Sequence, residues 1–134
     1  MKKSLSILFC CLLSAWLAGC APSASKPEAW GSFTRDPVVS SDGLYRAEHE
    51  VVTIDGISMI QVSVYDAATN ELLDCFMPAR AMDFRGICWE DGTHRIWTQS
   101  ADIGIDCYEL QDGRWVLNEN AEQPDSVISK WDVP

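Results

Sequence analysis

Residues 44–65 read LYRAEHEVVTIDGISMIQVSVY, and this stretch decides the fold class. Two runs rich in Val, Ile, Tyr and Thr flank Asp55-Gly56, and residues of these types favour strands. Asp-Gly supplies the positive φ angles that a tight hairpin turn requires. In the second run the apolar residues from Ile60 to Val64 alternate with polar ones, as in a strand with one buried face. The stretch therefore predicts an antiparallel hairpin.

The same pattern of short strand-forming runs and turn residues continues on both sides of this hairpin. Turn signals such as Asp42-Gly43, Asp91-Gly92 and Asp112-Gly113 separate further short runs of strand-forming residues. Because most links are short, neighbouring strands are expected to pair antiparallel as a meander. Pro37-Val38-Val39 is a further short apolar piece of strand-like character. The main expected strands, about seven in all, are Leu44–Ile54, Ile57–Tyr65, Glu71–Phe76, Phe84–Glu90, Thr93–Ser100, Ile103–Leu110 and Arg114–Asn118.

The chain contains an internal echo. The order of turns and strands between Asp42-Gly43 and Leu73 is repeated between Asp91-Gly92 and Val116. This rhythm resembles the blades of WD-repeat-like propellers, whose period is about 40–45 residues. Propellers have at least about four blades, and this chain has room for two. We therefore expect an all-β fold, a small antiparallel meander or sandwich of two blade-like units. Pairing of these units with other copies, as a larger ring, is the alternative.

The N-terminus has the three parts of an export signal. Lys2 and Lys3 form a basic start, Ser4 to Leu17 is apolar and uncharged, and small residues follow. The apolar run is shorter than the roughly 20 residues of a spanning helix, so a permanent membrane span is the weaker alternative. Leu17-Ala18-Gly19-Cys20 resembles the lipobox of bacterial lipoproteins. That resemblance implies cleavage before Cys20 and attachment of a diacylglycerol, with palmitate-type acyl chains, to its thiol.

The chain thus divides into three parts. Residues 1–19 are the signal peptide, which we expect to form a helix. Residues 20–29 are rich in small residues and Pro and form a flexible tether. Residues 30–134 form a single small β domain, held by lipid on the extracytoplasmic face of the cell membrane.

Charge limits the partners of this domain. The 134-residue chain has a net charge of −10, and removal of the signal makes the mature chain more acidic still. An acidic surface repels phosphate backbones, so no nucleic-acid partner is expected. An envelope protein or a glycan is the expected ligand.

Three cysteines follow Cys20, and an odd set allows at most one bridge among them. In a meander, Cys88 and Cys107 are separated by an intervening strand, at about 10 Å, which is too far for a disulfide. Cys75 and Cys88 lie on consecutive strands and are the better pair. The alternative is that all three are buried and unpaired. No Cys-x-x-Cys occurs, so neither a metal site nor a cofactor is expected.

Tryptophan offers the main candidate for ligand binding. Trp97 shares a strand face with Arg95 and Gln99, and an exposed ring there could stack on a sugar or on an aromatic group of a partner. We therefore predict a ligand-binding surface at Trp97, Gln99 and Arg95. The alternative is that the tryptophans, Trp97 included, lie in the core.

An enzyme is the alternative, although none of the common catalytic motifs occurs. Glu48 and Glu50 share one face of a strand, with His49 on the other. Asp102 and Asp106 share another face, on either side of Gly104. These four carboxylates could serve a small hydrolase acting on a cell-envelope or glycan substrate. The absence of a nucleophile motif favours the non-catalytic binding module.

Overall fold

The hairpin predicted around Asp55-Gly56 is present. β2 (Tyr45–Ile54) pairs antiparallel with β3 (Ile57–Asp66) over ten residues. The turn residues Asp55 and Gly56 have φ angles of 50° and 79°, the positive values that such a turn requires. The Asp-Gly turn sets the register in which Ile54 lies opposite Ile57.

The computed structural model describes residues 33–127, and this part is all-β. The predicted strands are all present, with ends that differ by a few residues. An additional strand, β1 (Val38–Val39), lies in the short apolar piece beside Pro37. The remaining strands are β4 (Leu72–Phe76), β5 (Phe84–Trp89), β6 (Ile96–Ser100), β7 (Gly104–Gln111) and β8 (Arg114–Leu117).

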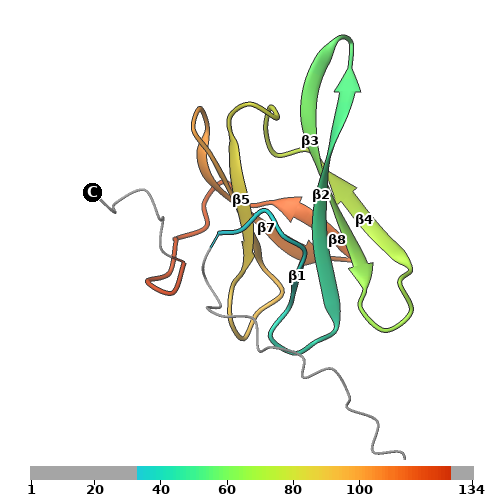
Figure 1. Cartoon of the computed structure of the whole chain (residues 1–134). Helices are drawn as coiled ribbons and strands as arrows, with labels where there is room; N and C mark the ends of the chain where they lie inside the picture. The colour runs from blue at the N-terminus through green and yellow to red at the C-terminus, as the bar shows by residue number, and fades with distance from the viewer. Residues whose placement is uncertain (1–32, 128–134) are drawn as a thin grey trace, which may run out of the picture.

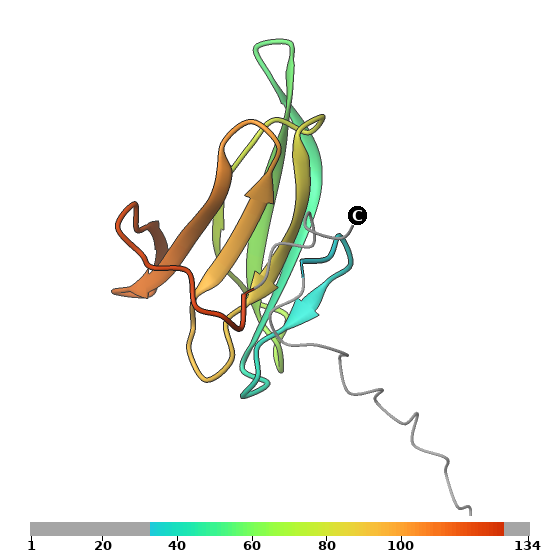
Figure 2. The ribbon, with the colours of Figure 1, turned by 90° about the vertical axis from the view of Figure 1, so that its left-hand side faces the viewer.

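The strands form two antiparallel sheets of four, ordered β1-β2-β3-β4 and β5-β6-β7-β8. Figures 1 and 2 show the two sheets as packed layers. The predicted meander holds within each sheet and breaks between β4 and β5. There the link crosses from the first sheet to the second, and its residue Arg80 forms a bridge with Met59 on the way.

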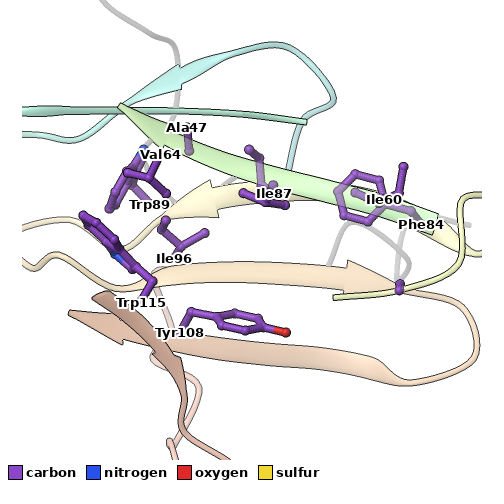
Figure 3. Packing of buried hydrophobic residues seen from close by; sticks show 11 residues of the cluster. Ala47, Ile60, Val64, Phe84, Ile87, Trp89, Ile96, Tyr108 and Trp115 are labelled. Carbon is purple, nitrogen blue, oxygen red and sulfur yellow. The ribbon is translucent and has the colours of Figure 1, made fainter. Parts of the chain in front are cut away.

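The core lies between the two sheets. Ile60, Val62 and Val64, the alternating residues of the sequence argument, are at most 3% exposed. Figure 3 shows Ile60 and Val64 facing the large side chains of the second sheet, among them Trp89 and Trp115, and Val62 belongs to the same cluster. Burial of such apolar surface contributes about 25 cal/mol per Å² and is the main force that holds the sheets together.

A second hydrophobic cluster covers the outer face of the second sheet. Cys88, Trp97 and Cys107 lie side by side there, and Phe33 and Val127 pack on them. Both ends of the described chain therefore cross this face, and no described segment crosses the outer face of the first sheet in the same way.

The crossing near Phe33 depends on one glycine. Thr34 bridges to Ile87 of β5, beside a register shift between Phe84 and Gly86. A Cβ atom at Gly86 would lie 2.7 Å from the carbonyl oxygen of Thr34, which is closer than side chains tolerate. Gly86 is therefore needed so that the N-terminal segment can approach β5.

Candidate functional site

The lipid acceptor predicted at Cys20 lies outside the described residues. The same holds for the signal peptide of residues 1–19 and the tether of residues 20–29. Across residues 33–127, no helix combines the length and the apolar character needed to cross a membrane.

The predicted exposure of Trp97 is wrong. Its side chain is 1% exposed, because Phe33 and Val127 cover the outer face of β6. Its indole Nε1 donates a hydrogen bond to Glu90 Oε2 at 2.8 Å. The alternation of β6 identified the face correctly, but it could not show that the ends of the chain cover that face.

The two predicted neighbours of Trp97 are also engaged. Gln99 is 4% exposed. The Arg95 guanidinium lies 2.6 Å from Glu109 and 3.7 Å from Glu90, and the side chain is 39% exposed. Arg95 thus balances the charge of two partly buried carboxylates. No open platform for stacking a ligand is present at Trp97.

The possible Cys75–Cys88 disulfide is absent, and the alternative of three unpaired cysteines is confirmed, with Cys88 and Cys107 buried but Cys75 exposed. The prediction assumed that β4 and β5 are neighbours, but they belong to different sheets. Cys75 lies opposite Ser63 on the outer face of the first sheet and is exposed. Cys88 and Cys107 lie on either side of Trp97, as the meander predicts.

The four candidate catalytic carboxylates do not converge. Glu48 and Glu50 lie on β2 in the first sheet, and Asp106 lies on β7 in the second. Asp102, in the turn before β7, accepts a hydrogen bond from the Ser100 hydroxyl at 3.0 Å. Burial raises the pKa of Asp106, and the charge of Glu119 adds to the effect. Among the described residues, no group of three or more His, Cys, Asp or Glu is placed to hold a metal ion.

Glu48 and Glu50 instead border a small pocket on the outer face of the first sheet. Its volume is about 70 Å³, and its lining includes Ser63 and Tyr65 of β3. Ser63 lies opposite Glu48 and is only 5% exposed. The Arg46 Nε lies 3.7 Å from Glu48 Oε2, so one of the two carboxylates has a partial counter-charge. The pocket is polar and acidic.

The outer half of the β2–β3 hairpin, residues 50–61, projects beyond the rest of the sandwich and is here called the arm (Figure 1). Val51, Ile54 and Ile57 are 61%, 40% and 46% exposed. One edge of the arm is open, because β1 pairs only with Arg46 and Ala47 of β2.

Sequence reasoning did not identify the arm, although two signals were present. The strands around Asp55-Gly56 are longer than the others, and the run from Val51 to Ile54 contains no charge.

No protein family, no curated protein and no solved structure matches this chain.

Proposed function

We propose that this chain is an exported bacterial lipoprotein, anchored through Cys20, whose β-sandwich is a non-catalytic binding module for another protein of the cell envelope. The export and the lipid anchor are supported by the lipobox of residues 17–20. The binding role rests on the arm, a projecting hairpin on which Val51, Ile54 and Ile57 are all exposed. Exposed apolar patches on soluble domains mark interaction sites.

A protein partner is favoured over a glycan. Sugar binding commonly uses exposed aromatic rings, and the tryptophans within residues 33–127, Trp89, Trp97 and Trp115, are at most 4% exposed. A hydrolase that uses Glu48, Glu50, Asp102 and Asp106 gains no support either, since these carboxylates are divided between two sheets.

The anchor is tested on intact protein isolated from its own host. The expected mass is that of a chain beginning at Cys20 with a diacylglycerol on its thiol, and Cys20→Ser is expected to lose this modification. Recovery of protein that keeps the leader, or that begins with a free thiol at Cys20, contradicts the anchor.

The binding role is tested by placing a photo-crosslinking residue at Ile57 of the full chain in living cells. Leu117 of β8 is a matched control, because it is 40% exposed against 46% for Ile57. We expect crosslinks to an envelope protein from position 57 and not from position 117. Absence of crosslinks from position 57, or equal crosslinking from both positions, contradicts the proposal.

A further inference from the structure

We propose that the open edge of β2 in the arm binds an extended segment of a partner protein as an added strand, with basic side chains of that segment over Glu48 and Glu50. The inference rests on the proposed function and states how the module binds and what it prefers. Peptides that add a strand gain affinity from main-chain hydrogen bonds and specificity from alternate side chains.

The edge is open because of the path of the chain before β1. Proline has no backbone N–H and cannot donate to a strand ladder. Pro37 precedes β1, and upstream of it Thr34 is bonded to Ile87 of the second sheet. The chain therefore leaves β2 just where β2 continues into the arm. Within residues 33–127 no strand pairs with β2 on this edge beyond Ala47.

Three residues present their backbone groups to this edge. The carbonyl of Tyr45 accepts a hydrogen bond from Ser40 N–H on the β1 side. In an antiparallel pair, every second residue bonds to the same neighbour. His49, Val51 and Thr53 therefore direct their N–H and C=O groups to the side where β1 would lie. An added strand would find three consecutive bonding positions there.

The outer face beside the edge selects basic side chains. In the register of β1, Pro37 falls opposite Glu48, so the first side chain that an added strand places on this face lies opposite Glu50 and diagonal to Glu48. Glu50 is exposed, and the Ser63 hydroxyl lies in the pocket of about 70 Å³ between the two strands. A lysine ammonium is a compact donor that suits two carboxylates and a hydroxyl.

The inner face beside the edge selects apolar side chains. Val51 points to this face and is 61% exposed, so an apolar residue opposite it would cover the side chain. His49 lies on the same face, and its ring packs against Phe84 with a centroid distance of 4.9 Å. The preferred segment therefore alternates basic residues with apolar ones.

A second copy of this chain fits the edge less well. Self-pairing would bring together two chains with a net charge of −10 each, and two sets of Glu48 and Glu50. Such repulsion opposes association and is strongest at low salt.

The test uses the full chain in detergent micelles and a capped eight-residue peptide of alternating lysine and valine. Binding is measured by fluorescence anisotropy and by shifts of the amide resonances of the protein. We expect the largest shifts at Val51 and Thr53. The same peptide N-methylated at alternate residues, which removes main-chain donors, is expected to bind much more weakly, and a glutamate–valine peptide not at all.

Two variants and one control locate the site. Val51→Pro removes an N–H from the open edge without removing a β2–β3 bond, and we expect the dissociation constant to rise about fivefold. Glu48→Gln with Glu50→Gln is expected to raise it about two- to fivefold. Glu119→Gln with Glu122→Gln makes the same change of charge at exposed positions elsewhere and should leave binding unchanged. Circular dichroism checks that each variant is folded.

Several results would overturn the inference. One is that the lysine peptide does not bind, or that it binds Val51→Pro as tightly as the wild type. Another is that the N-methylated peptide binds as tightly as the unmodified one. A third is that the two pairs of glutamine substitutions change the dissociation constant equally. Dimerisation of the wild type that Val51→Pro abolishes would instead assign the edge to a second copy. If position 57 crosslinks to an envelope protein as strongly in the Val51→Pro chain as in the wild type, only the added strand is contradicted and the proposed function stands.

Discussion

Asp42 joins two loops that lie far apart in the sequence. Its carboxylate accepts a hydrogen bond from the Ser40 hydroxyl at 2.6 Å and one from Leu44 N–H at 3.0 Å. The Nε2 of His94 lies 2.6 Å from its other oxygen. The loop between β1 and β2 is thereby tied to the loop between β5 and β6. Gly92 N–H strengthens the connection by donating to the Ser41 hydroxyl at 3.1 Å.

This carboxylate makes stability depend on pH in the acid range. The bonds from Ser40 and then His94 lower the pKa of Asp42 to about 2, from 3.8. A group with a lowered folded-state pKa contributes stability above its unfolded pKa and loses that stability as pH falls toward the folded one. The contribution is about 1 kcal/mol after allowance for the 38% exposure of the side chain. We expect the free energy of unfolding of the wild type, measured in urea, to fall by this amount between pH 4 and pH 2. That of Asp42→Asn should fall by less. An equal fall in the free energy of unfolding with pH in both proteins would contradict the prediction.

The thiols differ in reactivity because they differ in burial. Burial raises the pKa of Cys88 and of Cys107 to about 12 each, and Cys75 is exposed. The thiolate is the reactive form. In a chain that begins at Ala21, we expect a disulfide exchange reagent at pH 8 to label Cys75 quickly. Cys88 and Cys107 should react only at the rate of unfolding. Failure to label Cys75 in the native protein would indicate a bond between cysteines.

At the scale of the elements, the contact between β5 and the segment at Thr34 depends on Gly86. Gly86→Ala places a Cβ atom 2.7 Å from the Thr34 carbonyl oxygen, and the backbone must shift. We expect a loss of about 1–3 kcal/mol in the free energy of unfolding. Gly113→Ala is the control, since Gly113 has a φ of 80° but no atom near its Cβ position. Asn tolerates that φ, so Gly113→Asn should recover stability relative to Gly113→Ala. Gly86→Asn should be no better than Gly86→Ala, and recovery there would contradict the steric explanation.

Asp74 connects β4 of the first sheet to β8 of the second. It is 8% exposed and accepts the Trp115 backbone N–H at 2.7 Å, with Arg114 at 3.4 Å. Asp74→Ala leaves that N–H buried and unpaired, which costs about 1–3 kcal/mol. Asp74→Asn keeps an acceptor and should lose less. Thermal and urea unfolding measure both variants, and Glu71→Ala, at an exposed position, is the control. Equal losses in the two Asp74 variants would show that the hydrogen bond to Trp115 is not what matters.

Local patterns predicted the elements, and contacts between distant elements escaped prediction. Asp55-Gly56 and the alternation around Val62 are local, and both were sufficient to place the first hairpin. The crossing from β4 to β5 has no local signal, because a short link has a similar sequence whether it joins strands of one sheet or of two. The disulfide prediction for Cys75 and Cys88 failed for this reason, and the exposure predicted for Trp97 failed because Phe33 and Val127 cover it.

At the scale of the whole molecule, the two sheets correspond strand by strand, as the internal echo suggested. The loop from Ser40 to Tyr45 is closed by a hydrogen bond from the N–H of its first residue to the carbonyl of its last, at 2.8 Å. The loop from Glu90 to Arg95 is closed in the same way at 3.0 Å. The correspondence ends at the outer faces. Phe33 and Val127 cover that of the second sheet. Within residues 33–127 no comparable hydrophobic cluster lies on the outer face of the first sheet.

This arrangement makes each sheet dependent on the other. A four-stranded sheet with one apolar face needs a partner to bury that face, and here each supplies it for the other. We therefore expect the fragments of residues 33–82 and 83–127 to be unfolded when separate and to associate when mixed. Trp89, Trp97 and Trp115 all lie in the second fragment. Its tryptophan emission should shift to shorter wavelength when the first fragment brings Tyr45 and Val64 against Trp89 and Trp115. The control is a first fragment with Val64→Asp, which should not associate. A second fragment that folds alone would show that its outer cluster around Trp97 suffices as a core.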